Sequence, residues 1–314
     1  TILITFTNGP VVNAGVDLYA CKNNITTSLA GLVTGPTNTG SWSGGNGTFN
    51  PGNAVLNATY TPSAAEVAAG SVTLTLTSTN NGSCNLEKDS VIINFTNAPL
   101  VNAGIDMTAC AKNAAIALSG NVSGPTSTGV WSGGAGTYNP DNTGLNSIYT
   151  PSASEIAAGF VTLTLNSSNN GSCNTEKDSV MITFSSAPVV NAGADLTACK
   201  NNATTVLSGL VGGPTTTGVW LNGTGTFAPA NSVLSATYTP SAAELTAGFV
   251  KLVLGSTNNA NCNQERDTVM IVFTGSPLVD VGPDVSVCAN NATVAINGSV
   301  SIGATTGVWS SPNG

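Results

Sequence analysis

Hydrophobic and polar residues alternate along much of this chain with the period of two that is typical of β-strands. Val72, Leu74 and Leu76 alternate with threonines, which predicts a strand with one buried and one exposed face. Residues 91–95 show the same alternation, and an Asn-Asn-Gly turn separates the two segments. The pattern therefore predicts a long β-hairpin at the centre of a β-sheet.

Shorter elements surround this hairpin. Four further strands are predicted: residues 11–21, residues 25–33, the segment around Trp42, and residues 56–61. Ser63 and Glu66 form a capping box after a proline, and Gly70 provides a stop signal, so a short helix is expected between them. About seven short strands with turns between them are typical of an antiparallel sandwich of the immunoglobulin type.

The whole pattern returns every 89 residues without an insertion or deletion. The residues that keep this step are Trp42, Trp131, Trp220 and Trp309, then Cys21, Cys110, Cys199 and Cys288, and finally Cys84, Cys173 and Cys262. A chain of 314 residues holds about 3.5 such units. A fixed period of this length predicts a tandem array of small domains, and a lone Trp on the third strand of each is expected in the core.

The period also sets the expected domain boundaries. Residues 1–7 match the strand at 91–96, so we expect a segment of a longer array. The predicted parts are the last strand of a preceding repeat at 1–8, complete repeats at 9–97, 98–186 and 187–275, and a partial repeat at 276–314. Each linker is short and contains a proline, which predicts an extended rod that grows by roughly 35–45 Å per repeat.

Charge and composition exclude several functions. Only 7% of the residues are charged, the net charge is −8 and histidine is absent, which argues against nucleic-acid binding and against catalysis. Asp17 and Asn13 follow a linker, but calcium prefers more carboxylates than one repeat offers. We expect Asp17 to cap a local turn after Gly15. The sequence thus predicts no enzyme, no cofactor and no metal site.

The cysteines are predicted to form disulfides in an oxidising compartment, because no histidine and no CxxC motif accompanies them. Within a repeat the two candidates are 63 residues apart, a loop worth about 4 kcal/mol on the chain-entropy estimate. The predicted pairs are Cys21–Cys84, Cys110–Cys173 and Cys199–Cys262. Pairing Cys84 with Cys110 instead would have to span a strand, a linker and another strand.

Several short motifs carry a family resemblance over essentially the whole chain. They are VNAGxD from Val12, a cysteine at 21, WSGG from Trp42, GTF from Gly47, YTPSAAE from Tyr60 and NGSC from Asn81. The opening motif resembles PKD-type immunoglobulin-like domains, and the set resembles tandem repeats of giant cell-surface adhesins of the Bacteroidota, including SprB-type gliding-motility adhesins. That resemblance implies type 9 secretion, display on the outer cell surface, and partners in the secretion and surface-anchoring machinery.

The expected function is a structural stalk segment of a long secreted adhesin, which supports attachment and gliding motility while other regions bind a surface or glycan. Two alternatives stay open: repeats that are themselves a multivalent low-affinity binding surface, and spacer modules of a larger secreted enzyme. Ser90, Ser179 and Thr268 lie in Asp-Ser/Thr-apolar segments that resemble Bacteroidota O-glycosylation acceptors. The predicted neighbours of each repeat are the other repeats of the chain.

Overall fold

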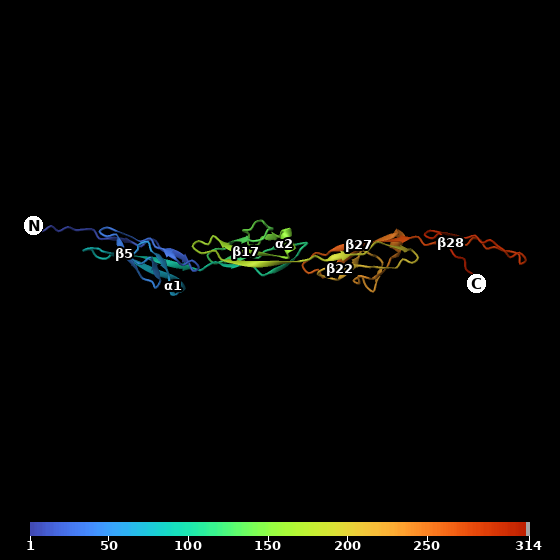
Figure 1. Ribbon diagram of the computed structural model, residues 1–314, viewed down its shortest axis with the longest axis horizontal. Coiled ribbons are helices and arrows are strands. Elements are labelled where there is room, and N and C mark those ends of the chain that lie inside the picture. Colours follow the sequence, from blue (N-terminus) through green and yellow to red (C-terminus); the bar gives the residue numbers. More distant parts are fainter. Residues whose placement is uncertain (312–314) are drawn as a thin grey trace. The chain divides into compact units, whose positions relative to one another are not determined.

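One β-sandwich recurs three times along the chain in the computed structural model, which describes residues 1–311 (Figure 1). The first copy contains β1 (Val11–Asn13), β2 (Leu18–Cys21), β3 (Thr27–Ser28), β4 (Leu32–Thr34), β5 (Thr39–Ser43), β6 (Thr48–Asn50), β7 (Thr59–Thr61), α1 (Ala64–Ala69), β8 (Ser71–Thr79) and β9 (Lys88–Thr96). The chain divides into two compact units. The second unit contains the third repeat together with the loop Thr108–Ala114 of the second repeat.

The other copies reproduce this order. The second contains β10 (Leu100–Asn102), β11 (Met107–Cys110), β12 (Ile116–Ala117), β13 (Asn121–Ser123), β14 (Thr128–Ser132), β15 (Thr137–Asn139), β16 (Ile148–Thr150), α2 (Ala153–Ala158), β17 (Phe160–Ser168) and β18 (Lys177–Ser185). The third contains β19 (Val189–Asn191), β20 (Leu196–Cys199), β21 (Thr205–Val206), β22 (Leu210–Gly212), β23 (Gly218–Leu221), β24 (Thr226–Ala228), β25 (Thr237–Thr239), α3 (Ala242–Ala247), β26 (Phe249–Ser256) and β27 (Arg266–Thr274).

Each sandwich has a four-stranded sheet on one side. In the first repeat its strand order is β2-β9-β8-β5, and in the third it is β20-β27-β26-β23. The opposite side holds the three-stranded sheet β3-β7-β6 and the pair β1-β4. The central hairpin is antiparallel, with Val72 opposite Ile93, whereas β2 runs parallel to β9, with Cys21 opposite Thr96. The predicted antiparallel sandwich therefore has one parallel pair, at this edge.

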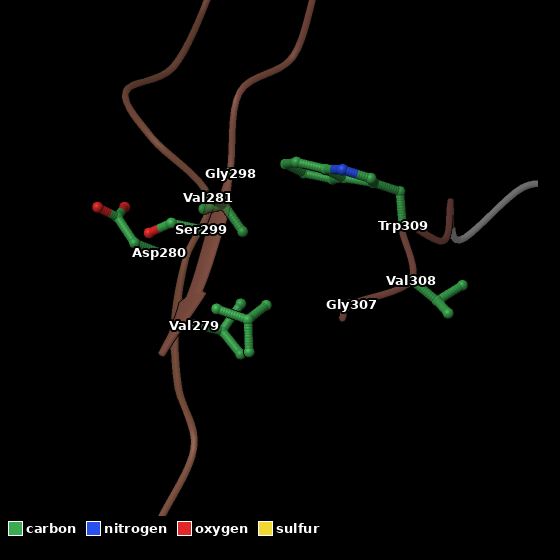
Figure 2. Close-up of a pocket in the computed structure, with 9 residues that line it drawn as sticks. Val279, Asp280, Val281, Gly298, Ser299, Gly307, Val308 and Trp309 are labelled. Carbon is green, nitrogen blue, oxygen red and sulfur yellow. The ribbon is translucent and has the colours of Figure 1, made fainter. Parts of the chain in front are cut away.

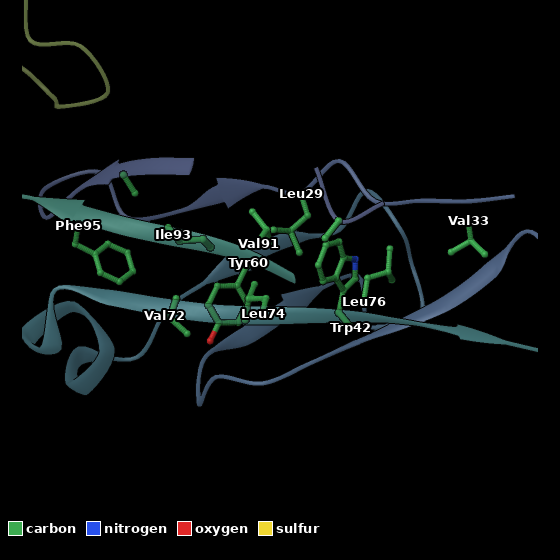
Figure 3. Packing of buried hydrophobic residues seen from close by; sticks show 12 residues of the cluster. Leu29, Val33, Trp42, Tyr60, Val72, Leu74, Leu76, Val91, Ile93 and Phe95 are labelled. Carbon is green, nitrogen blue, oxygen red and sulfur yellow. The ribbon is translucent and has the colours of Figure 1, made fainter. Parts of the chain in front are cut away.

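The hydrophobic face of the hairpin fills the core, as the alternation predicts (Figure 3). Trp42 has no exposed surface, and its indole Nε1 donates a hydrogen bond to the carbonyl of Leu56 at 3.0 Å. A Cβ atom on Gly31 would come within 2.8 Å of the Trp42 ring, so this position requires glycine. The prediction that the tryptophans are core residues is confirmed for Trp42 and for its equivalents Trp131 and Trp220.

Two predicted strands are interrupted in the structure. Residues 11–21 divide into β1 and β2, which belong to different sheets, because Asn13 and Gly15 form a turn between them. The side-chain oxygen of Asn13 accepts a hydrogen bond from Gly15 N at 2.8 Å, and Gly15 has a φ of 90°. Residues 25–33 likewise divide into β3 and β4, and strand β6 is an addition to the predicted set.

The predicted short helix is confirmed in all three repeats, each with a complete capping box and a left-handed glycine at its C-terminus. After the third repeat, the structure describes the hairpin of β28 (Leu278–Asp280) and β29 (Ser299–Ser301). Residues 312–314 of the predicted partial repeat lie outside the described residues. Within residues 1–311, no helix is long and apolar enough to cross a membrane.

Candidate functional site

Two disulfides join neighbouring repeats. Cys21 is bonded to Cys173 and Cys110 to Cys262, in each case across 152 residues. The predicted pairs within a repeat, Cys21–Cys84, Cys110–Cys173 and Cys199–Cys262, are therefore wrong. The alternative between Cys84 and Cys110 does not form either, and the free cysteines among the described residues are Cys84, Cys199 and Cys288.

The parallel edge strand explains why the pairing within a repeat fails. Cys21 lies opposite Thr96, at the end of β9, whereas Cys84 precedes Lys88, where β9 begins. The eight residue steps from Lys88 to Thr96 span about 26 Å at the rise of a β-strand. A disulfide needs Cα atoms within about 7 Å, so the two cysteines of one repeat lie at opposite ends of the sheet.

The same geometry brings Cys21 to the linker that follows its own repeat. Lys22 N donates a hydrogen bond to the carbonyl of Thr96 at 2.9 Å, which fixes the end of β2 beside the linker. Cys173 is placed by a turn in the next repeat, where its N–H donates to the carbonyl of Asn170 at 3.0 Å. The sulfur atoms of Cys21 and Cys173 lie 3.7 and 3.6 Å from the carbonyl oxygen of Asn97. The disulfide thus closes over the linker residue itself.

Side-chain amides reinforce the first junction. Asn23 Nδ2 donates to the carbonyl of Asn174 at 3.1 Å and to the carboxylate of Glu176 at 2.7 Å, and Asn174 Nδ2 donates back to the carbonyl of Asn23 at 2.7 Å. Asn24 Nδ2 donates to the carbonyl of Ser172 at 3.0 Å. The two loops that carry the cysteines therefore recognise each other through several directed hydrogen bonds as well as through the disulfide.

The second junction repeats this arrangement 89 residues further along. Asn113, the equivalent of Asn24, donates through Nδ2 to the carbonyl of Asn261 at 3.0 Å. Asn261 Nδ2 in turn donates to the carbonyl of Thr108 at 2.6 Å. Lys112 replaces Asn23 and forms an ion pair with Glu265, the equivalent of Glu176. The equivalent glutamate thus accepts from an amide in the first junction and pairs with a lysine in the second.

Sequence reasoning missed these junction residues. No function was predicted for Glu87 and its equivalents, yet Glu176 and Glu265 bind the preceding repeat. A signal for the site was present, because an asparagine recurs at 24, 113, 202 and 291 and a glutamate at 87, 176 and 265. Neither position belongs to a strand core, a turn signal or a helix cap, so their recurrence indicated a contact between repeats.

A second polar cluster lies inside each repeat. The carboxylate of Glu66 accepts hydrogen bonds from Tyr60 Oη at 2.8 Å, Asn46 N at 2.7 Å and Ser63 N at 2.7 Å. Burial acts to raise the pKa of Glu66, but the hydrogen bonds from Ser63, Asn46 and Tyr60 outweigh it and hold the pKa below its usual value. Burial and the Glu66 contact raise the pKa of Tyr60 to about 12. The ionised Glu66 side chain therefore joins the loop that contains Asn46 to the start of helix α1.

The other acids of each repeat bind backbone groups. Asp17 Oδ1 accepts a hydrogen bond from Ile92 N at 2.9 Å, so it ties the opening segment to β9. The prediction that Asp17 caps a local turn is therefore wrong. Asp89 Oδ2 accepts from Ala14 N at 2.8 Å. Both contacts recur in the second and third repeats. In residues 1–311 no group of three metal-ligating side chains comes together.

A small pocket lies in the fourth segment, between the β28–β29 hairpin and Trp309 (Figure 2). A Cβ atom on Gly298 would come within 2.8 Å of the Trp309 ring, which is the contact that Gly31 makes with Trp42. Trp309 is nonetheless 53% exposed, because no described strand pairs with its segment as β8 pairs with the Trp42 strand β5. The pocket is therefore the open core of a partial sandwich and offers no convergent polar groups to a ligand.

The predicted acceptor hydroxyls lie on the outer face of the hairpin. Ser90 and Ser179 are exposed and form hydrogen bonds with Thr75 at 3.0 Å and Thr164 at 2.9 Å. Thr268 is exposed at the same register, where it faces Val253 across the hairpin. The aspartate that precedes each hydroxyl is held by the backbone contact described above, so the segment has a structural role of its own.

The fold defines an all-β protein of three tandem immunoglobulin-like β-sandwiches with two disulfides. No protein-family model matches the chain, and no curated protein matches it.

Solved structures of other chains with tandem domains are similar to it at low identity. An I-band fragment of titin shares 12% identity over 85% of this chain and 99% of that one, with a TM-score of 0.43. Sidekick-1 immunoglobulin domains 1-5 share 13% identity over 87% of this chain and 60% of that one, with a TM-score of 0.36. Three domains of mouse cadherin-23 share 11% identity over 86% of this chain and 100% of that one, with a TM-score of 0.31.

Proposed function

We propose that this chain is a stalk segment of a secreted cell-surface adhesin and that it resists tensile force. The observation that carries the proposal is the position of the disulfides, each of which joins one repeat to the next over the linker. A tensile force on a simple array passes through every linker and can unravel each domain in turn. Here the covalent bridges offer the force a second path that avoids most of the polypeptide.

The two disulfide-closed loops overlap, which shortens that path considerably. From Cys21 the path crosses to Cys173, follows the 63 residues back to Cys110, and crosses again to Cys262. The direct chain from Cys21 to Cys262 has 241 residues. Fully extended, the two paths measure about 200 Å and about 800 Å. When the repeats unfold under tension, the disulfides therefore keep the distance between Cys21 and Cys262 far below the fully extended length of the chain between them.

The disulfides also support an oxidising location outside the cell, because such bonds persist there and are rare in the reducing cytosol. The sequence resemblance to the giant surface adhesins of the Bacteroidota supports display on the outer surface through type 9 secretion. We propose gliding motility as the use of the stalk in organisms that glide, and the exposed hydroxyls of Ser90, Ser179 and Thr268 as O-glycan acceptors. Intact mass of native material tests the last point, because a mass equal to the bare polypeptide contradicts it.

An in-frame deletion of residues 98–186 from the native protein tests the stalk function. The deletion brings Cys21 and Cys262 to the 152-residue spacing of the existing bonds, so the junction is expected to form again. A stalk then displays a shorter segment at unchanged surface density, and cell attachment stays nearly intact. Attachment that falls in proportion to the repeats removed, at equal surface display, contradicts the proposal and favours a binding role for the repeats themselves.

A further inference from the structure

Each disulfide connects the end of an opening segment to the start of a last strand in the next repeat. The opening segment of the first repeat, Val11–Cys21, ends at its cysteine. The partner Cys173 lies four positions before Lys177, where strand β18 begins. A covalent connection therefore passes through the first repeat along its opening segment and through the second along β18, in both cases from the amino to the carboxyl end of the segment.

Two such connections run through the three repeats. Path A consists of residues 11–21 and 173–199, joined by the first disulfide. Path B consists of residues 84–110 and 262–274, joined by the second disulfide. Path A follows the opening segments of the first and third repeats and the last strand of the second, and path B follows the other segment in each case. Every repeat is therefore crossed by both paths.

A large part of each repeat belongs to neither path. In the first repeat this part is the 62 residues between Cys21 and Cys84. It contains Trp42 and helix α1, together with strand β8 of the central hairpin. Most of the hydrophobic core therefore lies outside the covalent connections from one repeat to the next.

The fold holds the two paths side by side within a repeat. Strand β2 runs parallel to β9 in the first repeat, and β20 runs parallel to β27 in the third. Asp17 Oδ1 accepts from Ile92 N at 2.9 Å, and Asp89 Oδ2 accepts from Ala14 N at 2.8 Å, so two side chains also tie the opening segment to the last strand. Two segments that each cross a repeat in the direction of the chain must run parallel. The parallel pair of each sandwich is therefore the pair that the two paths use.

The two paths meet at each junction. The sulfur atoms of Cys21 and Cys173, which belong to path A, lie 3.7 and 3.6 Å from the carbonyl oxygen of Asn97 on path B. At the second junction, Cys262 Sγ on path B lies 3.5 Å from the carbonyl oxygen of Ser186 on path A. A peptide linker and a disulfide thus cross each junction in contact with each other, and neither of them leads through the core of a repeat.

We propose that paths A and B are two covalent cables that carry tension through the repeats, and that the residues between the two cysteines of each repeat carry none. The proposal rests on the stalk function stated above and assigns the force to particular segments. Ala14 contacts Asp89 and Cys21 lies opposite Thr96, so seven residue steps of the opening segment cover the same distance as seven steps of an extended strand. Each cable is therefore close to its full length in the folded repeat, and unfolding of the core lengthens neither.

Single-molecule extension of the full chain between two points on path A tests the proposal. Azide-bearing amino acids replace Val16 and Ala194, which are exposed and occupy the same repeat position, as attachment points for DNA handles. Path A joins them through five residue steps to Cys21 and 21 steps from Cys173, about 90 Å when fully extended, whereas the direct chain of 178 steps measures about 600 Å. We expect no unfolding step and a length that stops at about 90 Å. A reductant is expected to release about 600 Å.

Handles outside both paths provide the matched control. Ala54 and Ser232 are exposed and also share one repeat position, but each lies between the two cysteines of its repeat. Their shortest covalent connection has 56 residue steps to Cys110 and 30 steps back from Cys262, about 290 Å when fully extended. Tension at these handles pulls directly on the cores. We expect it to lengthen the molecule in unfolding steps up to about 290 Å without a reductant.

A step or a length beyond about 90 Å between Val16 and Ala194 in the absence of a reductant overturns the proposal. Disulfides within each repeat would give a limit of about 180 Å for the same handles. Failure of the control pair to lengthen in steps also overturns it, because residues 22–83 and their equivalents would then resist the force. Either result leaves the stalk function itself to the deletion of one repeat, which measures attachment and not extension.

Discussion

The interior of a repeat and the junction between repeats are built on different ranges of sequence. The interior depends on residues within one 89-residue unit, such as Trp42 and the side chains of β8 and β9 in the same core cluster. The junction joins residues 152 positions apart, such as Cys21 and Cys173. The interior is a hydrophobic cluster, whereas the junction consists of one covalent bond and a set of amide contacts. Substitutions can therefore weaken the interior of a repeat and the junction between repeats independently.

The two regions also differ in what a repeat pattern can reveal. Separations of 63 and 152 residues differ by one period of 89, so both pairings of Cys21 satisfy every repeat-level regularity. Only the direction of strand β2 relative to β9 decides between them, because it places Cys21 at the linker end of the sheet. Strand direction at a sheet edge is a property of the folded repeat and leaves no mark in the spacing of cysteines.

Removing the first disulfide is expected to have the largest effect. With Cys21→Ala and Cys173→Ala, the covalent path from residue 21 to residue 262 runs through 89 residues to Cys110, instead of 63, before it crosses the remaining bond. On the chain-entropy estimate, loss of a 152-residue loop lowers the free energy of unfolding by about 5 kcal/mol. Guanidinium unfolding and single-molecule extension measure the two effects. Cys84→Ala is the control, and any change of extension in that variant contradicts the pairing.

Trp131→Ala perturbs the interior without touching a junction. The indole is fully buried, so truncation is expected to cost about 3–5 kcal/mol in the second repeat. Trp309→Ala removes the equivalent side chain where it is 53% exposed and is expected to change the stability little. Chemical denaturation followed by circular dichroism compares the two. Similar losses in both variants would contradict the assignment of the tryptophans to covered and open cores.

The sequence predicts the interior of a repeat better than it predicts the junction between repeats. The period-two segments predicted β8 and β9 with the correct buried face, and the capping box predicted the helix, because local hydrogen bonding and burial determine both. The Asn13–Gly15 turn, which moves the chain from one sheet to the other, was read as continuous strand because its polar residues also fit an exposed strand face. The junction residues Asn24 and Glu176 depend on a neighbouring repeat, which the pattern of one unit does not contain.

Glu66→Gln is expected to make the stability of the repeat interior less dependent on pH. Because the folded state holds the Glu66 pKa below its usual value of 4.5, the carboxylate contributes stability above about pH 4.5, and this contribution is lost as pH falls through the folded pKa. At neutral pH the variant is expected to lose about 1.5–3 kcal/mol, the range for hydrogen bonds to a charged group. Urea unfolding at several pH values should show the gap to the parent closing below pH 4.5. A gap that does not depend on pH contradicts the ionised state of Glu66.

Asn24→Ala is expected to have the smallest effect, confined to the first junction. Loss of its hydrogen bond to the Ser172 carbonyl is expected to weaken the Cys21–Cys173 bond against reduction by about 0.5–1.5 kcal/mol. Equilibration of the protein with glutathione buffers, followed by thiol trapping, measures this shift. Asn202→Ala changes the same residue type in the loop of a free cysteine and should leave the Cys21–Cys173 equilibrium where it is. A shift of the same size in the control would assign the effect to general loop stability.

A tryptic map without reduction distinguishes disulfides between neighbouring repeats from disulfides within one repeat. The seven basic residues lie so that the cysteines fall on separate peptides, among them 1–22 with Cys21, 23–88 with Cys84, 89–112 with Cys110, 113–177 with Cys173 and 252–266 with Cys262. Bonds between neighbouring repeats predict that peptide 1–22 is linked to 113–177 and peptide 89–112 to 252–266. Peptide 1–22 linked to 23–88, together with 89–112 linked to 113–177, would contradict the account.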